Sequence, residues 1–179
     1  MIRIFDIIFS FIGLLIFSPF FIIFFFTGIF DTGSPLYIQK RVGLNLKSFN
    51  LIKFRTMKIG TKSRSTHLIN KSNITKIGYF LRKFKLDELP QLYNVLVGDM
   101  SFVGPRPCLI NQKKLIFERK KRGIFKVRPG ITGLAQIKGI NMAKPSLLAE
   151  TDKKMIHAKI NIFSYFNYIM LTIYLIRKS

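Results

Sequence analysis

The first thirty residues are the most apolar part of the chain. Between Ile7 and Phe30 the polar side chains are few: Ser10, Ser18 and Thr27. About 20 apolar residues suffice to cross the hydrocarbon core of a bilayer, so the run is long enough for a spanning helix. Ser18-Pro19 interrupts the run near its middle, and a proline inside a helix removes a hydrogen bond and produces a kink. From this pattern a kinked spanning helix and a re-entrant helix, which enters one leaflet and returns, are equally open.

The charges that flank this run bear on its orientation. Of the 30 bases and 8 acids of the chain, residues 1–30 contain one each, Arg3 and Asp6, so the remainder carries the whole net charge of +22. Basic segments favour the cytoplasmic side of a membrane, and Arg3 favours the same side for the other flank, although Asp6 weakens that preference. A secretory signal is disfavoured because no small-residue cleavage site follows the run. We expect residues 1–30 to form a membrane segment and residues 31–179 a domain at the cytoplasmic face, while the residues alone leave the re-entrant and spanning courses of the segment equally open.

Two short runs rich in β-branched and aromatic residues follow, Leu36–Gly43 and Phe49–Met57, with a glycine-containing turn between them. This pattern predicts a β-hairpin. On a strand Lys53 and Arg55 share one face, opposite the apolar residues that alternate with them. Such a pair alone is typical of a solvated face.

The rest of the body reads as a polar loop and two main helices. Residues 58–76 are polar and predict a loop. Residues 109–122 predict a helix with six bases, which either lies on anionic lipid or forms an ordinary solvated surface. Residues 160–176 are apolar with a thin polar stripe and predict an interfacial helix, or one that packs on the domain's own core. The expected fold class is α+β and mainly helical, with a small β-hairpin and interfacial amphipathic helices around a compact domain.

The composition limits the classes of function. A hydrophobic fraction of 49% is high for a chain of 179 residues that faces only water. The strongly basic body would attract polyanions, whether nucleic acid, anionic lipid headgroups or phosphorylated substrates. Cys108 is the only cysteine, which excludes an internal disulfide and is compatible with a reducing compartment.

Candidate chemistry centres on the adjacent acids Asp87 and Glu88, because carboxylates are scarce in this chain. The pair is followed by Arg106, held between two prolines that limit its motion. One interpretation is structural, since acids in the first turn of a helix complement its dipole. On the pair alone, this helix-capping interpretation is the better one. The other interpretation is catalytic, in which nearby cations such as Lys53, Arg82 or Arg106 keep Asp87 ionised.

An ionised aspartate can attack phosphorus. Attack on the diphosphate of a nucleotide-sugar would form an acyl-phosphate and expel a nucleoside monophosphate. Glu88 would then bind a metal ion or accept the proton of the incoming acceptor. Two neighbouring anions and a diphosphate call for a counter-charge, and Mg²⁺ held by Asp87, Glu88 and substrate oxygens would provide it. Arg106 offers planar, bidentate recognition of phosphate.

Several ordered motifs over most of the chain resemble those of the small monotopic phosphoglycosyl transferases, the bacterial sugar transferases that begin glycoconjugate assembly. The motifs occupy residues 39–43, 53–57, 74–78, 81–83, 86–95, 98–101, 103–107 and 129–136. The apolar head, residues 1–30 with the break at Ser18-Pro19, is similar to the family's re-entrant helix. The resemblance therefore implies a re-entrant membrane helix over these residues, in place of a spanning one. The short length matches members without an added multi-span domain.

The resemblance implies transfer of a sugar-1-phosphate from a UDP-sugar to polyprenyl phosphate, undecaprenyl phosphate in particular, with release of UMP and a need for Mg²⁺. It implies Asp87 as the nucleophile, Glu88 as its partner in metal or proton handling, and phosphate binding by Lys53, Arg82 and Arg106. It makes residues 31–179 a catalytic domain at the cytoplasmic face of the bacterial inner membrane, with membrane lipids and no nucleic acid as partners.

Some positions depart from the family's pattern. Phe84-Lys85 stands where relatives often carry small hydroxyl residues, Ile140 stands where many carry arginine, and no acid follows Asp152. These differences leave the sugar specificity open. The composition also fits a non-enzymatic, membrane-anchored basic protein that binds nucleic acid or anionic lipid. Glycosyl transfer without phosphate is a third alternative, which would release UDP in place of UMP.

Overall fold

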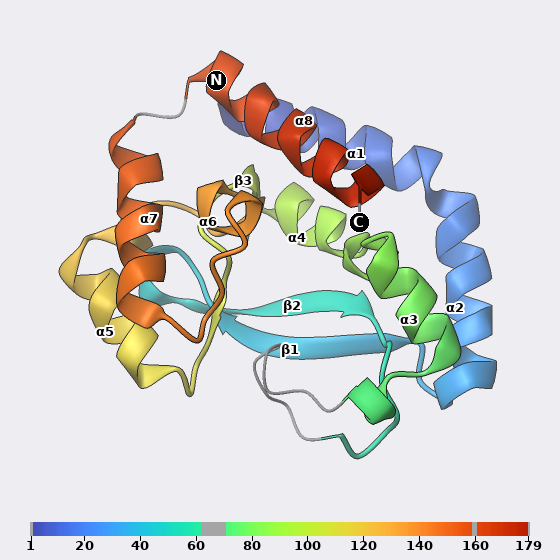
Figure 1. The fold of residues 1–179 in the computed structure, drawn as a ribbon. Helices are drawn as coiled ribbons and strands as arrows, with labels where there is room; N and C mark the ends of the chain where they lie inside the picture. Colours follow the sequence, from blue (N-terminus) through green and yellow to red (C-terminus); the bar gives the residue numbers. More distant parts are fainter. Residues whose placement is uncertain (1, 62–70, 159–160, 179) are drawn as a thin grey trace.

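The computed structural model describes residues 2–61, 71–158 and 161–178. The chain is a mainly helical α+β domain with little sheet, as predicted (Figure 1). Its helices are α1 Ile2–Ile16, α2 Ser18–Thr32, α3 Lys76–Lys83, α4 Gln91–Val97, α5 Lys113–Lys121, α6 Leu134–Ile137, α7 Pro145–His157 and α8 Ile162–Lys178. Its strands are β1 Leu36–Val42, β2 Ser48–Phe54, β3 Ser101–Val103, β4 Cys108–Leu109 and β5 Gly130–Thr132, and short 3₁₀ turns cover Leu44–Leu46, Lys71–Asn73, Leu86–Glu88 and Ile124–Lys126.

The apolar head is broken where the sequence predicts. Helices α1 and α2 meet at a bend of 62°, and Pro19 lies in the first turn of α2. The missing N–H of Pro19 leaves the carbonyl of Leu15 without its usual helical donor, and the hydroxyl of Ser18 donates to that carbonyl at 2.7 Å. Among the described helices none alone has the length and apolar character to cross a bilayer, whereas the bent pair together does. The re-entrant course stays a prediction.

The charged residues of α1 fasten it to the rest of the domain. Asp6 is buried, and its carboxylate accepts hydrogen bonds from the Ser101 hydroxyl, the Phe102 amide and the Tyr165 hydroxyl at 2.8–3.1 Å. The guanidinium of Arg3 donates to carbonyls in the last turn of α4, where a cation also complements the helix dipole. Arg3 and Asp6 therefore hold α1 against α4, β3 and α8.

The predicted hairpin is confirmed, with β1 and β2 antiparallel and Tyr37 opposite Lys53. Lys53 and Arg55 share one side, since the charged groups of both lie over the Tyr37 ring at 5.7 and 5.4 Å from its centroid. On its other edge β1 pairs with β4. The helix predicted from residue 109 therefore begins only at Lys113, because Cys108 and Leu109 are strand residues that pair with Val42 and Arg41. Figure 1 places α5 at the opposite end of the molecule from α2.

Helix α4 lies between α1 and the hairpin (Figure 1). Its Asn94 is buried and bonds to β2 in both directions, accepting from the Ile52 amide at 3.1 Å and donating to the Asn50 carbonyl at 2.8 Å. Leu51, Val95 and Met100 form the apolar core beside these bonds. The segment just before α4 is thereby held against the strand that carries Lys53.

Two glycines bring a second, parallel pair of strands together, β3 with β5. A Cβ on Gly130 would lie 2.0 Å from the amide nitrogen of Gly104, so only glycine permits this approach. Helix α8 covers the β3–β5 pair, and buried Tyr165 packs with Val103 and Met155 beneath it.

The C-terminal helix fits both interpretations of its sequence. On its inner side Phe166 makes edge-on contacts with Phe5 and Phe9 of α1, each with ring centroids 5.8 Å apart. On its outer side Phe163 is 82% exposed and Met170 is 62% exposed. The helix thus packs on the domain and also presents a free apolar face. Residues 62–70 of the loop predicted at 58–76 lie outside the described residues. After them Lys71–Asn73 form a 3₁₀ turn and Ile74 bridges to Met57.

We predict that the double substitution Ser18→Ala and Pro19→Ala straightens the α1–α2 junction, because an alanine in place of the proline restores an amide that can donate to the Leu15 carbonyl. Sidedness is measured with a cysteine appended to the N-terminus, in a Cys108→Ala background, using a membrane-impermeant maleimide. In the parent chain this cysteine should label from the same side as a Lys121→Cys control in the body. In the double variant it should label from the opposite side. Labelling from opposite sides in the parent chain would contradict the re-entrant course.

Candidate active site

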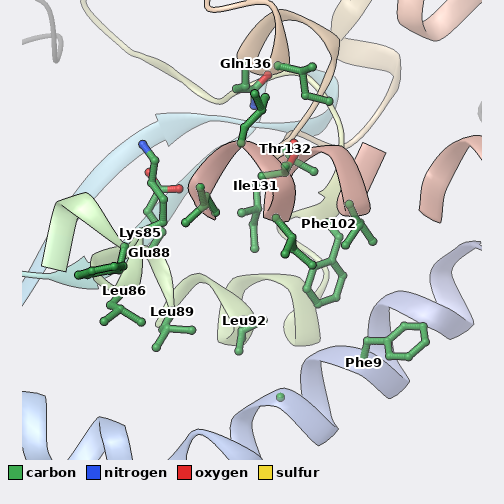
Figure 2. A pocket seen from close by; sticks show the side chains of 18 of the residues that line it. Phe9, Lys85, Leu86, Glu88, Leu89, Leu92, Phe102, Ile131, Thr132 and Gln136 are labelled. Atoms are coloured by element: carbon green, nitrogen blue, oxygen red, sulfur yellow. Dashed lines mark hydrogen bonds between the residues drawn. The ribbon is translucent and has the colours of Figure 1, made fainter. Parts of the chain in front are cut away.

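A cavity of about 790 Å³ lies between the N-terminal helix, the C-terminal helix and the segment around the acid pair. Its walls are mostly apolar, and Figure 2 shows Phe9, Leu89, Leu92, Phe102 and Ile131 lining it. Charged side chains also line it, namely Arg82, Lys83, Lys85, Glu88 and Arg106. The cavity therefore combines a mostly apolar volume with a charged region.

The acid pair lies in the 3₁₀ turn Leu86–Glu88, directly before α4. Pro90 precedes the first residue of α4, and no side chain caps that helix. The acids lie in the first turn of the 3₁₀ helix, as the helix-capping interpretation expects, but that interpretation does not account for their contacts with the surrounding cations. Glu88 lines the cavity, whereas Asp87 is 5% exposed and is not among the lining residues.

Glu88 forms an ion pair with Arg106, whose Nη2 donates to Glu88 Oε1 at 2.8 Å. Burial alone would raise the pKa of Glu88, but the charge and hydrogen bond of Arg106, together with Lys85 and Lys53, leave that pKa below its usual range. Glu88 in turn raises the pKa of Arg106. The structure thus brings together the acid and the proline-flanked arginine that lie 18 residues apart in the sequence.

The environment of Asp87 differs from the sequence expectation. Burial, and then the neighbouring charge of Glu88, raise the pKa of Asp87 to about 6, against the opposing effect of Lys53, Arg82 and Lys85. Cations therefore limit this rise without reversing it. At pH 7 a group with this pKa is about nine-tenths ionised, so Asp87 is both anionic and more basic than an ordinary aspartate.

Lys53 and Arg82 approach Asp87 from different elements. Burial lowers the pKa of Lys53 on β2 to about 8, while Asp87 and Glu88 oppose that shift. Burial likewise lowers the pKa of Arg82, in the last turn of α3. The Nε of Arg82 donates to the Thr56 hydroxyl at 2.8 Å, and Gly78 permits this contact because a Cβ there would lie 2.2 Å from the Thr56 carbonyl oxygen. All five predicted site residues therefore lie in one electrostatic cluster.

The turn that carries Arg106 is held from behind by two arginines that the sequence analysis did not assign to the site. Arg119 donates to the Arg106 carbonyl at 2.7 Å, and Arg41 donates to the Pro107 carbonyl at 3.1 Å. Arg119 is buried and also donates twice to Asp152 of α7, at 2.7 and 3.0 Å. The sequence placed Arg119 among the surface bases of its helix. The scarcity of acids in the chain was a signal that could have pointed to Asp152 as the partner of a buried base.

The donor set permits Mg²⁺ only in partnership with a substrate. The described residues contain no group of three or more histidine, cysteine or acidic side chains that would hold a metal. Mg²⁺ in phosphoryl-transfer sites is commonly bound by one or two carboxylates plus substrate phosphates and water. Asp87 and Glu88 fit that smaller requirement.

Comparison with known proteins places the chain in a family. The family model described as bacterial sugar transferase matches residues 1–179. The chain is 49% identical over 110 residues to the uncharacterized sugar transferase EpsL of Bacillus subtilis, covering 61% of this chain and 54% of that protein. It is 36% identical over 156 residues to the undecaprenyl-phosphate galactose phosphotransferase of Salmonella typhimurium, covering 78% and 33%. It is 38% identical over 131 residues to the UDP-galactose-lipid carrier transferase of Erwinia amylovora, covering 62% and 27%.

The chain belongs to the bacterial sugar transferase family, as its motifs indicated, and that family is one of transferase enzymes. It spans between about a quarter and a half of the length of these three relatives.

We predict that Asp152→Asn lowers the free energy of unfolding by about 3 kcal/mol, because it leaves the buried charge of Arg119 uncompensated. The midpoint of thermal unfolding in detergent measures the loss. Glu150→Gln on the same helix is the control, since the Glu150–Lys154 pair is exposed and such pairs stabilise little. Equal midpoints for the two variants would contradict a supporting role for the Arg119–Asp152 pair.

Proposed function

We propose that this protein transfers a sugar-1-phosphate from a UDP-sugar to polyprenyl phosphate, with undecaprenyl phosphate as the acceptor and UMP as the leaving product. This transfer would be the initiating step of glycoconjugate assembly. The observation that carries the proposal is a buried aspartate, ionised at neutral pH, among the cations Lys53, Arg82 and Arg106 and next to a mostly apolar cavity. The names of relatives that act on undecaprenyl phosphate and on UDP-galactose support the choice of substrates.

The first half-reaction uses Asp87. A carboxylate oxygen of Asp87 attacks the phosphorus that bears the sugar, and the bond from that phosphorus to UMP breaks, with UMP leaving as the anion. Lys53, Arg82 and Arg106 stabilise the charge that develops on the phosphate oxygens. Because Asp87 is 5% exposed, the donor must open the cover over that side chain before attack.

The second half-reaction regenerates the enzyme. A phosphate oxygen of polyprenyl phosphate attacks the same phosphorus and displaces the Asp87 carboxylate, which yields a polyprenyl diphosphate sugar. Glu88 accepts the proton of the acceptor phosphate if that oxygen is protonated, or contributes to metal binding with Asp87. Mg²⁺, when bound, would neutralise charge on the substrate diphosphate.

The lining of the cavity fits the acceptor in its chemistry. A polyprenyl phosphate has a long apolar chain and one anionic head, and the apolar walls with the cluster of Arg82, Glu88 and Arg106 offer a place for each part. The walls come from α1 and α8, whose outer faces are rich in exposed apolar side chains. We infer that these faces lie in the cytoplasmic leaflet of the bacterial inner membrane, where the acceptor resides, with α1–α2 re-entrant.

We predict that Asp87→Asn abolishes UMP release while the protein remains in the membrane fraction. The assay incubates membranes that contain the protein with a panel of UDP-sugars, Mg²⁺ and undecaprenyl phosphate, and measures UMP and UDP separately. Asp99→Asn, a change of the same kind outside the cluster, should retain activity. UMP release by the Asp87→Asn variant would refute Asp87 as the nucleophile. UDP as the product would indicate glycosyl transfer without phosphate. Strongly salt-dependent nucleic-acid binding with no activity would favour the non-enzymatic alternative.

We predict a bell-shaped dependence of kcat/KM on pH. Activity should fall below about pH 6, where Asp87 becomes protonated and loses its nucleophilicity. It should also fall above about pH 8, where Lys53 loses the charge that binds phosphate. Lys53→Arg should shift the alkaline limb upward, because arginine stays protonated. Full activity at pH 5 would contradict the requirement for an ionised Asp87.

A further inference from the structure

The backbone is strained at one residue beside the acid pair. Lys85 has φ 57° and ψ 18°, the left-handed conformation, and follows the residue that ends α3. Helices often end with such a residue, but it is usually glycine, because a side chain is unfavourable there. The other non-glycine residues with positive φ among the described ones, Asn45 and Leu46, lie in the hairpin connection. Strain of this kind tends to mark functional positions.

The side chain of Lys85 is free and close to the chemistry. It lines the cavity together with Glu88, and Figure 2 shows both side chains at the same end of the cavity. Within the described part of the chain its ammonium has no ion-pair or hydrogen-bond partner. Its charge nevertheless acts on both carboxylates, lowering the pKa of Asp87 and that of Glu88. A side chain that strains its own backbone therefore places an unpaired cation next to the acid pair.

The charge balance indicates what this cation binds. The acid pair and the three cations of the cluster together carry a net charge of +1 at neutral pH, which is less than the charge of a phosphate dianion. Lys85 brings the cluster to +2. Lysine carries three donors on a flexible stem and binds phosphate as a point charge.

We propose that the Lys85 ammonium binds a phosphate oxygen of a substrate held beside Glu88 and so sets the affinity for that substrate. The inference rests on the proposed phosphosugar transfer. The group recognised is a phosphate, which either the nucleotide-sugar or the polyprenyl phosphate can supply. The alternative is a lysine with no role in binding, which follows the end of α3 and extends into water.

Lys85→Gly separates these two interpretations, because glycine relieves the backbone strain and removes the charge together. The full chain, reconstituted in nanodiscs, is assayed with undecaprenyl phosphate and the UDP-sugar that supports UMP release. We expect a midpoint of thermal unfolding equal to or above that of the parent chain. We expect KM for one of the two phosphate substrates to rise about 10-fold, the loss typical of a charge-assisted hydrogen bond. The substrate whose KM rises identifies the phosphate that Lys85 binds.

Two further variants sharpen the test. Lys85→Arg retains the charge and should keep KM close to the parent value, whereas Lys121→Gln, on α5 and far from the cavity, should change nothing.

Unchanged KM values in Lys85→Gly would overturn the proposal, as would a Lys85→Arg variant as weak as Lys85→Gly. Failure of the proposed function itself would look different. UMP release would then persist in Asp87→Asn, or no UDP-sugar would support UMP release at all.

Discussion

The structure depends on keeping a negative charge on a buried aspartate. Asp87 lies beside a second carboxylate with little contact to water, and both conditions favour its neutral form. Opposing cations limit the pKa of Asp87 to about 6, and Arg106 neutralises the charge of Glu88 in a direct ion pair. The result is an aspartate that is ionised at neutral pH and unusually basic, which are the two properties a nucleophile needs.

The surrounding fold can be understood as the means of delivering those cations. Asn94 holds the acid-bearing segment against the strand that carries Lys53. Gly78 lets α3 approach the end of the hairpin closely enough for Arg82 to bond with Thr56. Arg119 and Arg41 hold the backbone of the Arg106 turn. None of these contacts involves a residue of α1, α2 or α8, so the reactive cluster is positioned by the body of the domain.

The apolar helices are joined to this body by polar contacts. Asp6 bonds to β3 and to Tyr165 of α8, and Arg3 bonds to the end of α4. These contacts fix α1 and α8 as two walls of the cavity that reaches Glu88. The same helices thus present an exposed apolar surface and line an apolar volume, which connects the membrane location we propose to the lipid acceptor we propose.

Much of this arrangement was predictable from the sequence, and the remainder was not for physical reasons. Proline at position 19 defines the bend, alternating residues define the hairpin, and the motifs around Asp87 and Arg106 define the family. The burial of Arg119 was missed because a basic helix predicts a solvated face and the pairing with Asp152 is long-range. The rise in the pKa of Asp87 was missed because the burial of a side chain cannot be judged from the residues next to it in the sequence.

The central claim is a covalent bond between Asp87 and a sugar phosphate, and intact-protein mass spectrometry of a quenched reaction tests it most directly. Incubation with an active UDP-sugar and no polyprenyl phosphate should add the mass of one phosphosugar. Fragmentation should locate this mass on Asp87, and it should disappear when undecaprenyl phosphate is added. UMP release under these conditions with no added mass, or with the mass on another residue, would contradict the account.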